Sequence, residues 1–238
     1  MPNYFMPGYY NYYFDPTYIL VIIGAVICMI ASANVSRTFN KYSRVYTTRR
    51  VAANQVAAQI LQGAGIHDVR IERIQGNLTD HYDPRNKVLR LSESVYDSTS
   101  VAAVGVAAHE CGHAVQHNVG YVPIKLRNAV VPVVDLGSKL SWPVIMIGLV
   151  LGSVGLLQVG IILFAFTLVF QVITLPVEFN ASGRALRILK ERGILYGDEI
   201  SGARRVLGAA AMTYVTSTVA TILQLLRLVL LFGRRSDD

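Results

Sequence analysis

The stretch Val101–His117, VAAVGVAAHECGHAVQH, contains the pattern His-Glu-x-x-His. Residues four apart in a helix lie on one face, so His109 and His113 can direct their ring nitrogens at a single metal ion. Glu110 follows the first histidine, where its carboxylate can face a water on that metal without being a ligand. This combination is typical of zinc-dependent peptidases and predicts a metal-binding helix.

The residues around the motif favour a buried helix. Ser98 or Ser100 can cap its N-terminus, and Gly120 is a suitable stop at its C-terminus. The alternative is an ordinary core helix whose histidines have other polar partners. Two histidines and a glutamate are costly to bury without a shared role, so we favour the metal-binding interpretation.

The distribution of charge predicts a membrane protein. Only 16% of the 238 residues are charged, against about 25% in a typical soluble domain. Residues 16–36, 140–177 and 206–226 contain no Asp, Glu, Lys or Arg. One span needs roughly 20 residues, so the long middle run is expected to form two short spans, about 141–157 and 159–176.

The basic residues lie beside these uncharged runs, which explains the net charge of +7 without a nucleic-acid partner. Lys and Arg, but no acidic residue, occur in residues 37–50 just after the first run. The positive-inside rule therefore places the N-terminus outside and the metal motif in the cytoplasm, with the lipid bilayer as a partner. The tyrosine-rich residues 1–17 are expected to lie at the membrane interface.

We therefore expect a mainly α membrane protein, with about four transmembrane helices and a small α+β zincin-like catalytic domain. The expected units are an N-terminal tail and first transmembrane helix (1–36), the catalytic domain (37–140), a transmembrane hairpin (141–177), a helix carrying the third metal ligand (178–205), and a fourth transmembrane or interfacial helix with a tail (206–238).

Inside the catalytic domain, we expect a helix over about 49–62, a strand at 69–72, a polar connection at 75–83 and a second strand at 87–91. A strand beside a zincin metal helix can hold an extended peptide by β-augmentation. We assign that role to Lys87, Val88, Leu89, Arg90 and Leu91. Residues 121–139, which contain two prolines, are expected to form an interfacial helix on the membrane.

A catalytic zinc usually takes three protein ligands and a water, so the motif needs one more ligand. His117 lies about 12 Å along the helix from His109, too far to share one ion. The remaining candidates are His81, Asp83, Glu93, Asp135 and Glu178.

We favour Glu178, the first charged residue after the long uncharged run. It follows an expected helix break at Pro176 and begins a new helical stretch. The alternative is an acidic residue placed near a helix N-terminus because the macrodipole favours it there. If Glu178 shares a metal with the motif, the run between them must cross the membrane an even number of times.

Two further segments, LTDHYDPRNKVLRLSESVY (78–96) and LPVEFNAS (175–182), together with HECGH, resemble the YugP-like neutral zinc metallopeptidase family of bacterial membranes. The resemblance extends from about Tyr42 to Arg187. It implies a membrane-embedded gluzincin, distantly similar to HtpX-type proteases, in which a glutamate on a later helix completes the metal site. That glutamate corresponds to Glu178.

Proteases of the HtpX type often carry an aspartate four residues after the ligand glutamate, and this chain has Ser182 there. Asn180 and Ser182 are therefore candidates for the residues that hold the ligands in place.

The expected activity is hydrolysis of a peptide or protein near the inner membrane face, with Zn²⁺ as cofactor. Zinc lowers the pKa of its water, and Glu110 takes the proton as general base and later delivers it to the leaving amine. His81, Tyr82 and Arg184 are candidates for stabilising the oxyanion.

The alternative function is a non-proteolytic, zinc-binding membrane regulator or chaperone-like protein that has kept the site. A transporter with a structural metal is less favoured, because the uncharged runs contain no charged residues to mark a substrate pathway.

Overall fold

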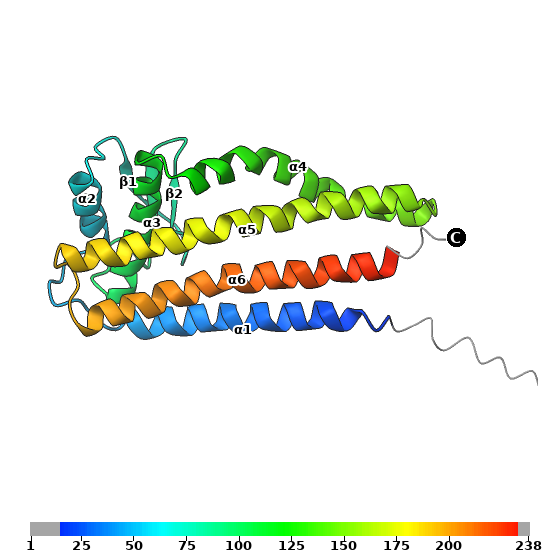
Figure 1. The fold of residues 1–238 in the computed structure, drawn as a ribbon. Coiled ribbons are helices and arrows are strands. Elements are labelled where there is room, and N and C mark those ends of the chain that lie inside the picture. The colour runs from blue at the N-terminus through cyan, green and yellow to red at the C-terminus, as the bar shows by residue number, and fades with distance from the viewer. Residues whose placement is uncertain (1–14, 233–238) are drawn as a thin grey trace, which may run out of the picture.

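The computed structural model describes residues 15–232, so the expectation for the tyrosine-rich N-terminus falls almost wholly outside the described residues. The elements are α1 (Tyr18–Tyr42), α2 (Ala53–Gly63), β1 (Arg70–Ile74), β2 (His81–Asp83), β3 (Val88–Ser92), α3 (Val101–Asn118), α4 (Val122–Val150), α5 (Val154–Glu191) and α6 (Asp198–Phe232) (Figure 1). The predicted fold class, mainly α with a small α+β region, is confirmed.

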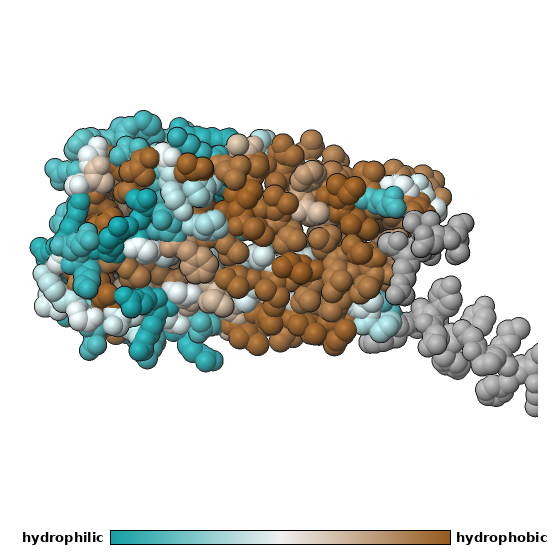
Figure 2. All heavy atoms as spheres, viewed as in Figure 1, coloured by the Kyte–Doolittle hydropathy of each residue, from teal (hydrophilic) through white to brown (hydrophobic). Residues whose placement is uncertain are grey.

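Four helices, α1, α4, α5 and α6, are long and apolar enough to cross a membrane. They lie side by side, with α1 against α6, α6 against α5 and α5 against α4. Hydrophobic residues cover one end of this bundle, and hydrophilic residues gather at the end that holds α2, α3 and the sheet (Figure 2). The prediction of a membrane protein with about four transmembrane helices is therefore confirmed.

Helices α4 and α5 form a hairpin whose turn contains Gly152, with a φ of 64°. This left-handed conformation is one that glycine adopts at little cost. The expected interfacial helix over 121–139 is not a separate element, because α4 runs from Val122 to Val150 and contains Pro132 and Pro143. Proline in a transmembrane helix is tolerated where neighbouring groups satisfy the freed backbone.

The expected helix break at Pro176 is also wrong. Helix α5 continues through Pro176 for 38 residues, so Glu178 lies in its interior. The helix macrodipole therefore does not explain this glutamate, since its effect is confined to the first turn.

At the polar end, α3 is the central element, packed against α2, α5 and α6. Its start is fixed by Ser100, whose Oγ accepts a hydrogen bond from the backbone N–H of Ala103 at 3.2 Å. After the helix ends, Gly120 has a φ of 63°, as expected for its role as a stop. Most of the side chains of α3 are buried.

The three strands form one sheet in the order β1-β3-β2, with β1 parallel and β2 antiparallel to β3. The sequence pattern predicts β1 and β3 within two residues of their observed bounds. It does not predict β2, which lies in the segment expected to be a polar connection.

Candidate metal centre

Three side chains from two helices converge at the junction of the bundle and the polar end. His109 and His113 come from α3 and Glu178 from α5, and each offers one ligand atom within 4.8 Å of the others. Glu178 Oε2 lies 3.4 Å from His109 Nε2 and 3.5 Å from His113 Nε2. The Glu178 side chain is 3% exposed, so its carboxylate is almost completely buried.

The close approach of α3 and α5 depends on Gly112, inside the His-Glu-x-x-His motif. A Cβ on this glycine would lie 2.7 Å from the carbonyl oxygen of Ala181. Atoms cannot pack so tightly, so only glycine allows α3 to lie directly against the α5 backbone. Gly112 lies between His109 and His113 in sequence, and Ala181 lies one helical turn after Glu178. The close contact between Gly112 and Ala181 therefore brings the three side chains together.

The residues fit a zinc ion. Two imidazoles and a carboxylate are a common ligand set for catalytic zinc. Glu178 Oε2 is a buried oxygen with no hydrogen-bond partner among the described residues, although two imidazole nitrogens lie near it. A buried carboxylate oxygen without a partner is costly, and a cation between it and the two nitrogens would remove that cost.

The local field also favours positive charge. Burial lowers the pKa of His113, but the carboxylate of Glu178, 3.5 Å from His113 Nε2, and the nearby carboxylate of Glu110 outweigh burial and raise this pKa above its usual value. The carboxylates therefore attract positive charge to the space that a metal would occupy.

Each histidine is held by a polar partner on its other ring nitrogen. His109 Nδ1 lies 3.0 Å from Ser182 Oγ, and His113 Nδ1 lies 3.1 Å from Gln116 Oε1. If Nδ1 carries the proton and donates to these oxygens, Nε2 is left free to bind a metal. Ser182 thus contacts His109 at the position where HtpX-type proteases often have an aspartate.

Gln116 links this arrangement to α5. Its Nε2 donates to the carbonyl oxygen of Val177 at 2.8 Å and to Asn180 Oδ1 at 3.0 Å. Arg184 Nε also donates to Asn180 Oδ1, at 2.7 Å. Asn180 is therefore connected to His113 through Gln116. The only sequence signal for Gln116 is its position three residues after His113.

Two cavities flank the three side chains. We call the first the apolar cavity, of about 230 Å³, and the second the polar cavity, of about 250 Å³. Both are lined by Asp80, His109, Glu110, Glu178 and Tyr214. Glu110 therefore borders both spaces, beside the three candidate ligands.

Asp80, on the segment before β2, lines the same two cavities as Glu110 of α3. Its carboxylate accepts hydrogen bonds from the backbone N–H of Ser92 at 2.7 Å and from Ser92 Oγ at 2.9 Å. Burial raises the pKa of Asp80, the Ser92 hydrogen bonds oppose this, and the charge of Glu110 adds to the rise. These bonds fasten the segment before β2 to the end of β3, next to the ligands.

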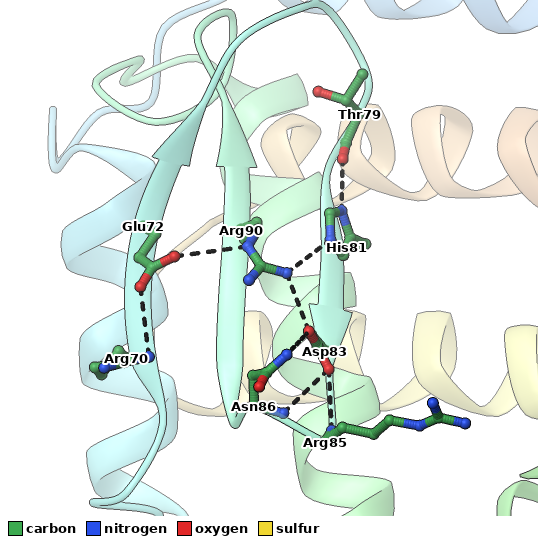
Figure 3. A network of polar contacts seen from close by, with 8 residues as sticks. All are labelled: Arg70, Glu72, Thr79, His81, Asp83, Arg85, Asn86 and Arg90. Atoms are coloured by element: carbon green, nitrogen blue, oxygen red, sulfur yellow. Dashed lines mark hydrogen bonds and ion pairs between the residues drawn. The ribbon is translucent and has the colours of Figure 1, made fainter.

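The candidates for oxyanion stabilisation fall into two groups. His81 and Tyr82 line the polar cavity. Arg184 lines neither cavity, and its guanidinium lies over the Tyr121 ring at 5.8 Å. His81 is tied to its neighbours, because Nδ1 lies 2.9 Å from the carbonyl oxygen of Thr79 and Nε2 lies 3.3 Å from Arg90 Nη1 (Figure 3).

The predicted substrate-binding strand Lys87–Leu91 is wrong. β3 is the central strand and is paired on both sides, so it has no free edge for a peptide. Val88, Leu89 and Leu91 are completely buried. Figure 3 shows Arg90 between Glu72 of β1 and Asp83 of β2, at 3.6 and 3.1 Å. The edge strand next to the ligands is β2.

The other ligand candidates take no part in the three-residue group. Asp83 accepts hydrogen bonds from Asn86 and Arg90. Asp135 forms an ion pair with Lys139 at 2.7 Å, and Glu93 is exposed.

Two further polar residues of the site, Arg127 and Tyr214, are not indicated by the sequence pattern. Arg127 of α4 lines the polar cavity, and its Nη1 lies 3.5 Å from Glu178 Oε1. Tyr214 of α6 lines both cavities. Neither residue belongs to a motif, and only the packing of α4 and α6 beside α5 brings them to the site.

Comparison with known proteins identifies the family of this chain. Residues 17–233 match a family described as "Putative neutral zinc metallopeptidase". The chain is 42% identical over 219 residues to "Putative membrane protease YugP" of Bacillus subtilis (strain 168), covering 92% of this chain and 97% of the relative. No solved structure gives a significant match. The chain therefore belongs to the neutral zinc metallopeptidase family, and its cofactor is zinc.

Proposed function

We propose that this protein is a membrane-bound zinc endopeptidase in which His109, His113 and Glu178 hold the metal. One observation carries the proposal. The buried Oε2 of Glu178, which has no hydrogen-bond partner among the described residues, faces the Nε2 atoms of both histidines of a His-Glu-x-x-His helix. The family match and the similarity to a membrane protease support the same activity.

Zinc, when bound, supplies a water of lowered pKa and polarises the carbonyl of the peptide bond to be cleaved. Glu110, which borders both cavities, takes a proton from that water with its carboxylate. It then delivers the proton to the departing amine nitrogen. Ser182 and Gln116 keep the two imidazoles oriented with Nε2 toward Glu178.

The developing oxyanion needs hydrogen-bond donors. We assign this role to the Tyr214 hydroxyl, because Tyr214 borders both cavities next to Glu110 and Glu178. The guanidinium of Arg127 is a second donor from the opposite wall of the polar cavity. His81 and Tyr82, on the edge strand, are positioned to contact the peptide backbone.

The catalytic unit extends beyond residues 37–140, because α5 contributes a ligand. We propose that residues 37–140 and the end of α5 that carries Glu178 lie on the cytoplasmic side. Helix α4 leaves the polar end of the bundle and α5 returns to it (Figure 1). The basic residues after α1 favour the cytoplasmic side for this end. A cysteine introduced at Gly152, in the hairpin turn, should then react with a membrane-impermeant reagent on intact cells. Protection of this cysteine until the cells are opened would reverse the orientation.

The deciding experiment compares wild type with Glu110→Gln, both purified in detergent, for bound zinc and for cleavage of an unfolded test protein. Equal zinc with cleavage reduced by about 10²–10⁴-fold is expected, because general-base catalysis typically contributes this factor. Equal cleavage by both proteins would refute the mechanism. Wild type that binds zinc but cleaves nothing would favour a non-proteolytic regulator, especially if Glu110→Gln keeps the cellular activity that His109→Ala loses.

A further inference from the structure

The two cavities beside the metal ligands differ in their walls, although they share the ligands and Glu110. The lining of the polar cavity includes the polar side chains of His81, His117 and Arg127. Apart from the shared residues, the apolar cavity has mostly aliphatic or small side chains. A peptide bond placed at the ligands therefore has a polar space on one side and an apolar space on the other.

The walls of the apolar cavity come from five parts of the chain, one of which is α5 with Glu178 and Ser182. Val106 belongs to α3, one turn before His109, and Leu78 to the segment before β2. Val35 belongs to α1, and Ala210 and Ala211 belong to α6. Two helices long enough to cross the membrane thus line a space that reaches the general base.

We propose that the apolar cavity is the subsite for an apolar side chain of the substrate, directly beside the peptide bond that is cleaved. This rests on the proposed peptidase function and names the substrate class, a peptide with a residue such as Leu or Phe next to that bond. The cavity borders Glu110 and Glu178, so a side chain inside it belongs to a residue that flanks the reacting carbonyl. Apolar walls select apolar side chains by the hydrophobic effect.

The cavity exists because α6 carries two small residues where it faces the ligands. Ala211 is buried, and a larger side chain there would extend into the space. Gly208, on the same helix, is exposed and lines a different groove, and a Cβ added to it would meet nothing within 4 Å. These two positions give a filling variant, Ala211→Leu, and a matched control, Gly208→Leu.

Leu78 supports the same assignment. Its φ of 55° is in the left-handed region, which is unfavourable for a leucine. Strained residues of this kind are concentrated at ligand-binding and catalytic sites. Here the strained residue contributes part of the cavity wall, whereas glycine or asparagine would suit the backbone better.

The test uses the full-length protein in detergent and internally quenched peptides that differ only at the residues flanking the cleaved bond. Wild type should prefer Leu or Phe over Ala at one of these positions by about 10-fold or more in kcat/KM. Ala211→Leu should reduce that preference to about 2-fold by raising KM for the Leu peptide, with little change for the Ala peptide. Gly208→Leu should behave like wild type.

Zinc content and melting temperature show whether each variant is folded. If Ala211→Leu loses zinc, Leu78→Ala serves as the second variant and should weaken the preference by widening the cavity. Wild type that cleaves without preference would overturn the subsite. A folded Ala211→Leu that keeps the preference would also do so, as expected if a lipid chain fills the cavity instead. Wild type that binds zinc and cleaves no peptide would refute the peptidase function itself.

Discussion

Helices α3 and α5 both contribute proposed metal ligands, but their surroundings differ. Most residues of the 18-residue α3 are buried in protein. In the 38-residue α5, the buried residues of the second half form one stripe: Thr174, Val177, Glu178, Ala181, Ala185 and Leu189. The rest of α5 is more exposed, as expected for a helix that faces lipid. The metal centre therefore forms where a membrane helix first becomes covered by a protein domain.

This difference explains why the two helices are unequally easy to interpret from sequence. On α3 the ligands and the base are adjacent in one motif. On α5 the proposed ligand is a single glutamate, and only its position after an apolar run distinguishes it. The comparison predicts that α5 is as necessary as α3 for binding the metal, and three substitutions test this in order of expected effect.

The largest effect is expected from Glu178→Ala. Removing this carboxylate leaves two ligands, so zinc should be lost on dialysis under conditions where wild type keeps it. Cleavage should fall by at least about 10³-fold. Metal analysis after dialysis measures the first effect, with His109→Ala as the reference for loss of an α3 ligand. Full zinc retention in Glu178→Ala would mean that the third ligand is another residue.

A smaller effect is expected from Gly112→Ala, which tests the contact between the helices. The added Cβ would lie 2.7 Å from the Ala181 carbonyl oxygen, so α3 and α5 must separate. Overpacking of this kind costs about 1–3 kcal/mol. The melting temperature and zinc affinity should both fall.

Gly105→Ala is the matched control for this substitution. It lies on the same helix, and its Cβ would meet that of Ala203 at an ordinary distance of 3.4 Å. Alanine favours a helix more than glycine does, and no clash opposes this gain. The Gly105→Ala variant should therefore be at least as stable as wild type. Equal melting temperatures for the two variants would show that the α3–α5 contact is not tight.

The smallest effect is expected from Ser182→Ala, which removes the partner of His109 but no ligand. Loss of such a partner typically weakens metal affinity by about 10–100-fold. Competition with a zinc-binding dye measures this change. Ser182→Asp should restore the affinity, because aspartate accepts a hydrogen bond from the same imidazole nitrogen. Unchanged affinity in Ser182→Ala would show that packing alone orients His109.

The predictable parts of the molecule were those with local signals. His109, Glu110 and His113 share a spacing with chemical meaning, and Ser100 and Gly120 mark the ends of their helix. The uncharged runs predicted the membrane helices. The long middle run predicted a hairpin of two spans, and the turn of the observed hairpin contains Gly152.

The parts that could not be predicted depend on tertiary contacts. β2 has no alternating pattern, and the bonds of Asp80 to Ser92 and of Asp83 to Arg90 hold it beside β3. Proline usually ends a helix in water, so the continuation of α5 through Pro176 was not expected. Tyr214 lies in an apolar run and has no sequence signal for its position at the metal centre.

The continuity of α5 also determines the depth of Glu178, the proposed third ligand, relative to the bilayer. A helix rises 1.5 Å per residue, so the part of α5 before Glu178 is on the order of 36 Å long. The hydrocarbon layer of a membrane is about 30 Å thick. A helix that begins at the far boundary therefore carries Glu178 just past the near one. The length of α5 before Glu178 therefore sets the depth at which this proposed ligand lies, and a substrate would have to bring its peptide bond to that depth.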